Sequence, residues 1–133
     1  MNKKYYSRVA AITVTFNSSR TLIHTIQKIE QQTYPVEWVL IVDNASDEKN
    51  RNALIDMEQT YDNIVLLSLK ENTGGAGGFE AGMRYAKTHW NPEWFWIMDD
   101  DAYPRNNCLE HLDRKSTRLN SSHRSLSRMP SSA

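Results

Sequence analysis

Residues 94–101 read Trp-Phe-Trp-Ile-Met-Asp-Asp-Asp, so a run of large apolar side chains is followed directly by three carboxylates. An apolar run bounded by Pro92 and by acids is typical of a buried strand. Adjacent carboxylates repel one another and are costly to desolvate, which favours a bound cation that neutralises them. Oxygen ligands of this kind suit Mg²⁺ or Mn²⁺. The alternative is a solvated acidic turn after the strand.

Strand-like and helix-like patterns alternate along the first 112 residues. Runs rich in β-branched residues are typical of strands buried on both faces, and helical spacing of apolar residues follows each of the first three runs. The alternation predicts an α/β fold with a Rossmann-like, mostly parallel sheet, right-handed crossovers and helices on both faces. The expected strands are 9–16, 38–42, 64–69 and 94–98. Three helices are expected: the first ends near Gln31, and the second covers 48–59. The third follows the glycine-rich stretch, with Phe79, Met83 and Ala86 on one face.

A polar cluster follows each expected strand. Ligands of parallel sheets bind at the carboxyl ends of the strands, so these clusters are expected to meet at one edge. This convergence favours a binding site over a plain acidic turn. The clusters are residues 17–18, 43–44, 72–75 and 99–101.

Length and composition restrict the class of protein. The 133 residues suffice for one domain. No stretch is apolar enough to be a membrane span or a signal peptide, so a cytoplasmic location is expected. The single cysteine, Cys108, excludes an internal disulfide framework. Acidic residues outnumber basic ones in residues 1–112, which leaves no basic surface for nucleic acid.

The last residues, 113–133, differ in composition from the rest of the chain. They are rich in Ser and Arg and poor in large apolar residues, which predicts a disordered tail. Residues 113–123 and 127–133 also resemble a translated sequencing adapter, so we expect this tail to be non-native. Residues 1–112 are then expected to be the N-terminal part of a longer domain.

Several motifs together resemble family-2 glycosyltransferases of the GT-A fold. The glycine block and the triple aspartate are most similar to the galactofuranosyl- and rhamnosyltransferase branch. The resemblance extends from Arg8 to Leu112. The motifs, in the order seen in that family, are Val14-Thr15-Phe16-Asn17, Gln32-Thr33-Tyr34-Pro35, Val42-Asp43-Asn44-Ala45-Ser46, the block from Glu71 to Phe79, and Asp99-Asp100-Asp101.

The resemblance implies a pocket for a pyrimidine base at Asp43. In the family this aspartate accepts a hydrogen bond from the imide nitrogen of uracil or thymine, and a carboxylate suits that task because it only accepts. Phe16 and Asn17 would flank the same base. The alternatives are that Asp43 caps a helix and that Phe16 belongs to the core.

The resemblance also places the stretch from Asn72, with Gly74 and Gly75, against the nucleotide-sugar. Glycines let backbone amides approach a pyrophosphate and open a helix whose N-terminus favours anions. A dinucleotide-binding fingerprint is disfavoured because the block follows the third strand and has Ala81 at its last glycine position. A purely structural tight turn is the remaining alternative.

For the acidic stretch, the resemblance implies that Asp101 contacts the metal directly. Asp99 would contact the sugar or ribose and the waters of the metal, and Asp100 is also expected near the donor. Alternate residues of an extended segment face the same way, so Asp99 and Asp101 are expected to reach one site while Asp100 points elsewhere. The cofactor is expected to be Mn²⁺ or Mg²⁺.

The function implied is a metal-dependent, inverting glycosyltransferase in cell-wall or polysaccharide biosynthesis. Its donor would be UDP-galactofuranose or dTDP-rhamnose, and its acceptor a glycan or a lipid-linked glycan, with the full-length enzyme associating peripherally with the inner face of the membrane. The general base is expected beyond Leu112, so this chain is expected to be inactive. Alternatives are a nucleotidyltransferase, disfavoured by the lack of a glycine-rich basic loop after the first strand, a non-catalytic nucleotide-sugar-binding module, and an NAD-binding module.

Overall fold

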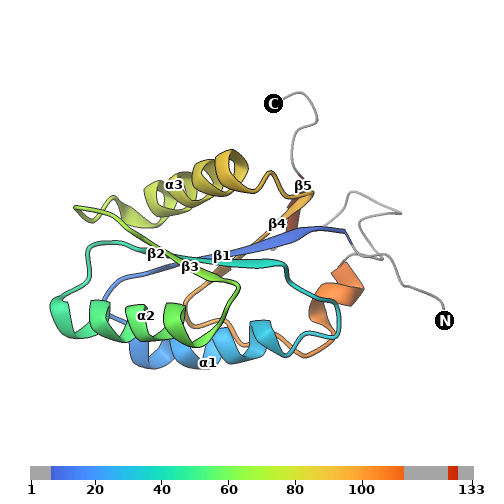
Figure 1. The fold of residues 1–133 in the computed structure, drawn as a ribbon, viewed down its shortest axis with the longest axis horizontal. Helices are drawn as coiled ribbons and strands as arrows, with labels where there is room; N and C mark the ends of the chain where they lie inside the picture. The colour runs from blue at the N-terminus through green and yellow to red at the C-terminus, as the bar shows by residue number, and fades with distance from the viewer. Residues whose placement is uncertain (1–6, 113–125, 129–133) are drawn as a thin grey trace.

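A computed structural model describes residues 7–112 and 126–128, which form a sheet covered by helices on both faces (Figure 1). Strands and helices alternate as the sequence predicts. The boundaries differ from the expected ones by one or two residues, except at the third helix. The elements are β1 (Val9–Thr15), α1 (Ser19–Glu30), β2 (Trp38–Asp43), α2 (Glu48–Thr60), β3 (Ile64–Ser68), α3 (Gly74–His89), β4 (Trp94–Asp99) and β5 (Leu126–Arg128).

The sheet has five strands in the order β3-β2-β1-β4-β5, and its first four strands are parallel. β1 is the middle strand of the five: Thr15 pairs with Asp43 of β2, and Val14 pairs with Asp99 of β4. The predicted parallel sheet is therefore confirmed.

The short strand β5 was not predicted. It pairs antiparallel with β4, with Ser127 opposite Phe95. It falls within the tail expected to be disordered, so that expectation is wrong for residues 126–128, whose backbone completes a row of hydrogen bonds along the open edge of β4. The rest of the tail lies outside the described residues.

Two apolar layers hold the sheet between the helices. α1 and α2 lie on one face and α3 lies on the other (Figure 1). Because side chains alternate along a strand, Ala11 of β1 packs into the layer under α1 and α2, while Ile12 packs into the layer under α3. The prediction of helices on both faces is confirmed, and it explains why β1 reads as a nearly unbroken apolar run.

Helix α3 begins inside the glycine block rather than after it. A Cβ atom added at Gly78 would lie 2.6 Å from Val14 Cγ1, and one added at Gly82 would lie 2.8 Å from Val42 Cγ2. These two glycines therefore let α3 lie closely against β1 and β2. Close packing outweighs the low helix propensity of glycine here. No helix in the described part of the chain is both long and apolar enough to cross a membrane.

Candidate functional site

The predicted site residues lie at the carboxyl edge of the sheet. The chain leaves β1 toward β2 on one side, and it returns through α3 to β4 on the other side of β1. The point where strand order reverses, between β1 and β4, is where ligands of such sheets bind. Asp43 and Asp99 end the two strands that flank β1. Because neighbouring strands lie about 5 Å apart, the backbones of these two residues are separated by roughly 10 Å.

Asp43 is a buried carboxylate at this edge, with 1% of its surface exposed. Its Oδ1 accepts a hydrogen bond of 2.9 Å from the backbone N–H of Ser46. Its Oδ2 is buried and has no hydrogen-bond partner in the described part of the protein. A buried acceptor without a partner is unusual and costs free energy. Asp43 does not cap α2, whose N-cap is Asp47.

Asn17 connects the loops that follow β1 and β2. Its N–H donates to Ser46 Oγ at 2.9 Å, and its Oδ1 accepts from the N–H of Asp47 at 2.8 Å. These bonds hold Asn17 in a left-handed conformation, with φ of 52°, a conformation that asparagine tolerates better than most residues. The neighbouring Phe16 is 47% exposed, so it is not plain core, and its ring is free to contact a ligand.

Asn44 is a structural residue of the edge that the sequence interpretation did not single out. It is buried, its Nδ2 donates to Gly74 O at 2.9 Å, and its Oδ1 accepts from the Thr73 N–H at 2.9 Å. It therefore fixes the start of α3 against the end of β2. The signal in the sequence is an asparagine directly after a strand, but its partner, 30 residues away, is visible only in the fold.

Asn72, Gly74 and Gly75 lie exposed at the N-terminus of α3. Asn72 Oδ1 accepts from the Gly74 N–H at 2.8 Å, and Gly74 has a φ of +78°, which favours glycine. No atom lies within 4 Å of a Cβ built on Gly75. Thr73, the N-cap, makes no side-chain capping bond, so the amides that follow Gly74 receive no hydrogen bond from its hydroxyl.

The three acidic residues form a turn rather than an extended segment. Asp99 ends β4, and the Ala102 N–H donates to Asp99 O at 3.1 Å, which closes the turn. The premise of an extended segment is therefore wrong. Asp99 and Asp101 are exposed, whereas Asp100 is partly buried.

Asp100 is turned toward the sheet. Burial raises the pKa of its carboxyl group above the ordinary value, the nearby Thr15 hydroxyl lowers it, and the charges of Asp101 and Asp99 raise it further. Thr15 Oγ1 is buried and makes no hydrogen bond of ordinary geometry in the described part of the protein. The carboxyl groups of the turn thus repel one another, as the sequence predicts.

The chemistry of Asp99 and Asp101 fits a divalent cation that is completed by other ligands. Both carboxylates are exposed, and neither forms an ion pair in the described part of the chain. Within residues 7–112 and 126–128, no three His, Cys, Asp or Glu side chains gather as a metal site. Mg²⁺ is commonly held by one or two carboxylates together with substrate phosphates and waters. Two carboxylates are therefore enough protein ligands for such an ion.

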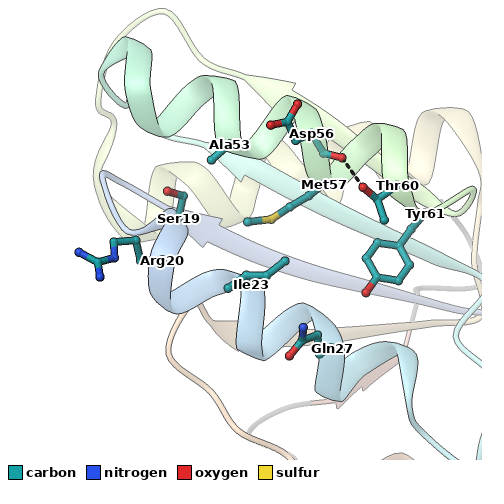
Figure 2. A pocket seen from close by; sticks show the side chains of 9 residues that line it. All are labelled: Ser19, Arg20, Ile23, Gln27, Ala53, Asp56, Met57, Thr60 and Tyr61. Atoms are coloured by element: carbon teal, nitrogen blue, oxygen red, sulfur yellow. Dashed lines mark hydrogen bonds between the residues drawn. The ribbon is translucent and has the colours of Figure 1, made fainter.

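A separate cleft of about 460 Å³ lies between α1 and α2 (Figure 2). Ile23 of α1 and Met57 of α2 line it, and a hydrogen bond of 2.7 Å from Thr60 Oγ1 to Asp56 O lies at its rim. None of the residues predicted to bind the donor lines this cleft.

Comparisons with known proteins give one consistent result. Residues 10–121 match the sequence model of a family described as Glycosyl transferase family 2. The chain is 31% identical over 98 residues to galactofuranosyltransferase GlfT1 of Mycolicibacterium smegmatis, a match that covers 72% of this chain and 30% of that protein.

Solved structures with a similar fold include a mannosyltransferase and S. aureus TarS. Mannosyltransferase PcManGT from Pyrobaculum calidifontis, in complex with GDP-Man and Mn²⁺, has a TM-score of 0.67 and 27% identity over 77% of this chain and 30% of that one. S. aureus TarS 1–349 in complex with UDP has a TM-score of 0.69 at 17% identity, over 87% of this chain and 37% of that one, and shows the fold alone. The chain thus spans about a third of the length of these proteins.

Proposed function

The chain belongs to glycosyl transferase family 2, and we propose that it forms the nucleotide-sugar-binding part of an enzyme that transfers a sugar to a glycan or lipid-linked acceptor. The donor in this proposal is UDP-galactofuranose or dTDP-rhamnose. Similarity to a galactofuranosyltransferase supports the first of these. Because the chain covers 30% of that relative, the activity of the whole enzyme is itself part of the proposal.

The observation that carries the proposal is the unpartnered Oδ2 of Asp43. A carboxylate only accepts hydrogen bonds, so a ligand N–H satisfies this oxygen and a ligand carbonyl does not. The imide N–H of uracil or thymine has the required polarity. In this proposal the exposed ring of Phe16 packs beside that base.

The reaction proposed is a displacement at the anomeric carbon of the donor. An acceptor hydroxyl attacks this carbon from the side opposite the diphosphate, the bond from carbon to diphosphate oxygen breaks, and the configuration is inverted. The hydroxyl proton passes to a general base, which we place outside residues 1–112. We therefore expect the 133-residue chain to bind a donor without transferring its sugar.

Asp99 and Asp101 would hold the divalent ion, and the open N-terminus of α3 would lie near the diphosphate. When bound, Mn²⁺ or Mg²⁺ stabilises the negative charge that develops on the departing diphosphate. The complex of PcManGT with GDP-Man and Mn²⁺ supports this assignment of the cofactor.

The experiment is calorimetric titration of UDP in the presence of Mn²⁺, with the chain and three variants. Asp43→Asn keeps an oxygen for the Ser46 N–H but presents an amide N–H to the base, so we expect UDP binding to weaken at least about tenfold, the size expected when a buried polar group loses its partner. Asp101→Asn should abolish the dependence on Mn²⁺. The matched control, Asp56→Asn on the exposed surface of α2, should bind UDP as the unaltered chain does.

Two results would contradict the proposal. One is the absence of any heat of UDP binding to the unaltered chain with Mn²⁺ present. The other is equal binding by the Asp43→Asn and Asp56→Asn variants. The donor sugar is then decided by assaying the full-length enzyme with UDP-galactofuranose and dTDP-rhamnose in parallel.

A further inference from the structure

Helix α1 contacts the acidic turn through the hydroxyl group of Thr25. This residue is 1% exposed, and its Oγ1 donates to Ala102 O at 2.6 Å and to Asp100 O at 2.9 Å. A hydroxyl has one proton, so the two carbonyl oxygens share it. The usual partner of a helical threonine hydroxyl is a carbonyl of its own helix, whereas Thr25 bonds to a segment 75 and 77 residues away.

The two acceptors flank Asp101 along the backbone. The Asp100 carbonyl precedes it, and the Ala102 carbonyl follows it. The turn itself is closed by the bond from the Ala102 N–H to Asp99 O. Thr25 therefore binds the turn on both sides of one proposed metal ligand, and the closing bond leads to the other, Asp99.

The same side of α1 holds the chain beyond the turn. The Lys28 ammonium lies 4.8 Å from the centre of the Tyr103 ring, and Gln32 Nε2 donates to Arg105 O at 2.6 Å. Positions 25 and 28 are three apart, the spacing of neighbours on one helical face, and Gln32 follows shortly after the end of α1 at Glu30. The segment after β4 thus lies along α1, and the Thr25 hydroxyl is its buried attachment point.

We infer that Thr25 is a positioning residue for the divalent cation: its hydroxyl fixes the backbone from which Asp99 and Asp101 project, and so sets the separation of the two carboxylates. The inference rests on the proposed function. Groups that hold metal ligands in place contribute to metal affinity without touching the metal. In the proposed site, Asp99 and Asp101 are the two protein ligands of the metal. The geometry of the site therefore depends strongly on how the turn that carries them is held.

Thr25→Val and Thr25→Ser are the variants that test the inference. Valine replaces the hydroxyl by a methyl group of similar size, and serine restores the hydroxyl. Thr13→Val is the matched control, because Thr13 is equally buried and its Oγ1 has no partner in the described part of the protein. Each variant of the 133-residue chain is titrated with Mn²⁺ in the presence of UDP, and hydrogen exchange at the Ala102 amide is measured without metal.

We expect Thr25→Val to weaken Mn²⁺ binding about tenfold, as for other groups that hold metal ligands. Exchange at the Ala102 amide should become faster in the same variant. Thr25→Ser should restore both values toward those of the unaltered chain, and Thr13→Val should change neither. A role limited to general packing would affect Thr25→Val and Thr13→Val alike.

The inference would be overturned if Thr25→Val bound Mn²⁺ with unchanged affinity while Asp101→Asn lost Mn²⁺ binding. If Asp101→Asn also binds Mn²⁺ normally, the proposed metal site itself is wrong, and the exchange rate still shows whether Thr25 holds the turn. Should Thr25→Val fail to fold, the hydroxyl proton of Thr25 is measured in the unaltered chain by nuclear magnetic resonance. Exchange of that proton at the rate of a solvent-exposed hydroxyl would overturn the inference.

Discussion

Asn44 and Gly74 are joined by a hydrogen bond of 2.9 Å, from the Asn44 side-chain Nδ2 to the Gly74 carbonyl oxygen. The bond links the end of β2 to the first residue of α3. Asn44 Oδ1 accepts from the Thr73 N–H on the same loop. One buried side chain thus determines where α3 begins relative to the carboxyl edge of the sheet.

Replacing this asparagine should destabilise the fold. Asn44→Ala leaves the Gly74 carbonyl and the Thr73 amide without their partner, so we expect the free energy of unfolding to fall by about 2–4 kcal/mol. Urea denaturation measures the loss. Asn52→Ala, at an exposed position of α2, is the control and should change stability by less than about 0.5 kcal/mol. Equal stability of the two variants would show that the Asn44 bonds contribute nothing.

The glycines of α3 should differ in their tolerance of a side chain. A Cβ at Gly78 or Gly82 would lie under 3 Å from Val14 or Val42, so Gly78→Ala and Gly82→Ala should each lower stability by about 1–3 kcal/mol. Gly75→Ala should leave stability unchanged or raise it by up to about 1 kcal/mol, since alanine favours a helix and no atom lies near. Thermal unfolding of the three variants tests this ranking, and a large loss in Gly75→Ala would contradict it.

Gly75→Ala also tests whether a diphosphate approaches α3. The open space beside Gly75 admits a ligand close to the backbone, and a methyl group would fill part of it. We therefore expect this variant to fold normally and to bind UDP with Mn²⁺ several-fold more weakly. The measurement is the calorimetric titration described above. Unaltered UDP binding by Gly75→Ala would place the diphosphate elsewhere.

Glu30 should make stability depend on pH. Burial raises the pKa of its carboxyl above the usual value of 4.5, while the hydrogen bond from Asn63 lowers it. A raised pKa means that the folded state binds the proton more tightly, so this contribution to stability is present below pH 4.5 and is lost as pH rises through the higher pKa of the folded state. Glu30→Gln keeps an oxygen for Asn63 Nδ2 and carries no charge.

Unfolding curves across the same pH range measure this effect. We expect Glu30→Gln to match the unaltered chain below pH 4.5 and to be the more stable protein above the folded pKa. Glu71→Gln, at an exposed position, is the control and should not change the shape of the curve. A constant difference between Glu30→Gln and the unaltered chain at every pH would contradict the assignment.

The strands of the parallel sheet were predictable because their signal is local. Residues 9–14 and 94–98 are mostly apolar, and such runs are typical of strands covered on both faces. The start of α3 was not predictable from propensity. Its glycines disfavour a helix locally, and the close approach of Val14 and Val42 that accounts for them exists only in the folded chain.

For the candidate site, the sequence predicted which polar residues share one edge of the sheet. It offered an acidic turn only as the alternative to an extended segment, because the bond that closes the turn and the Thr25 hydroxyl that holds it come from backbone geometry and from a distant helix. Thr25 itself looks like an ordinary polar residue on α1. Its partners are more than 70 residues away, and one sequence gives no sign of such a pairing.

The central position of β1 has a consequence for how the protein assembles. β1 pairs with β2, which follows soon after it, and with β4, which is synthesised much later. During synthesis on the ribosome, β1, β2 and β3 can associate first. The other edge of β1 stays unpaired until β4 has been synthesised. Contacts between segments so distant in sequence form slowly, so we expect the carboxyl ends of β1 and β4 to be the last part of the sheet to come together.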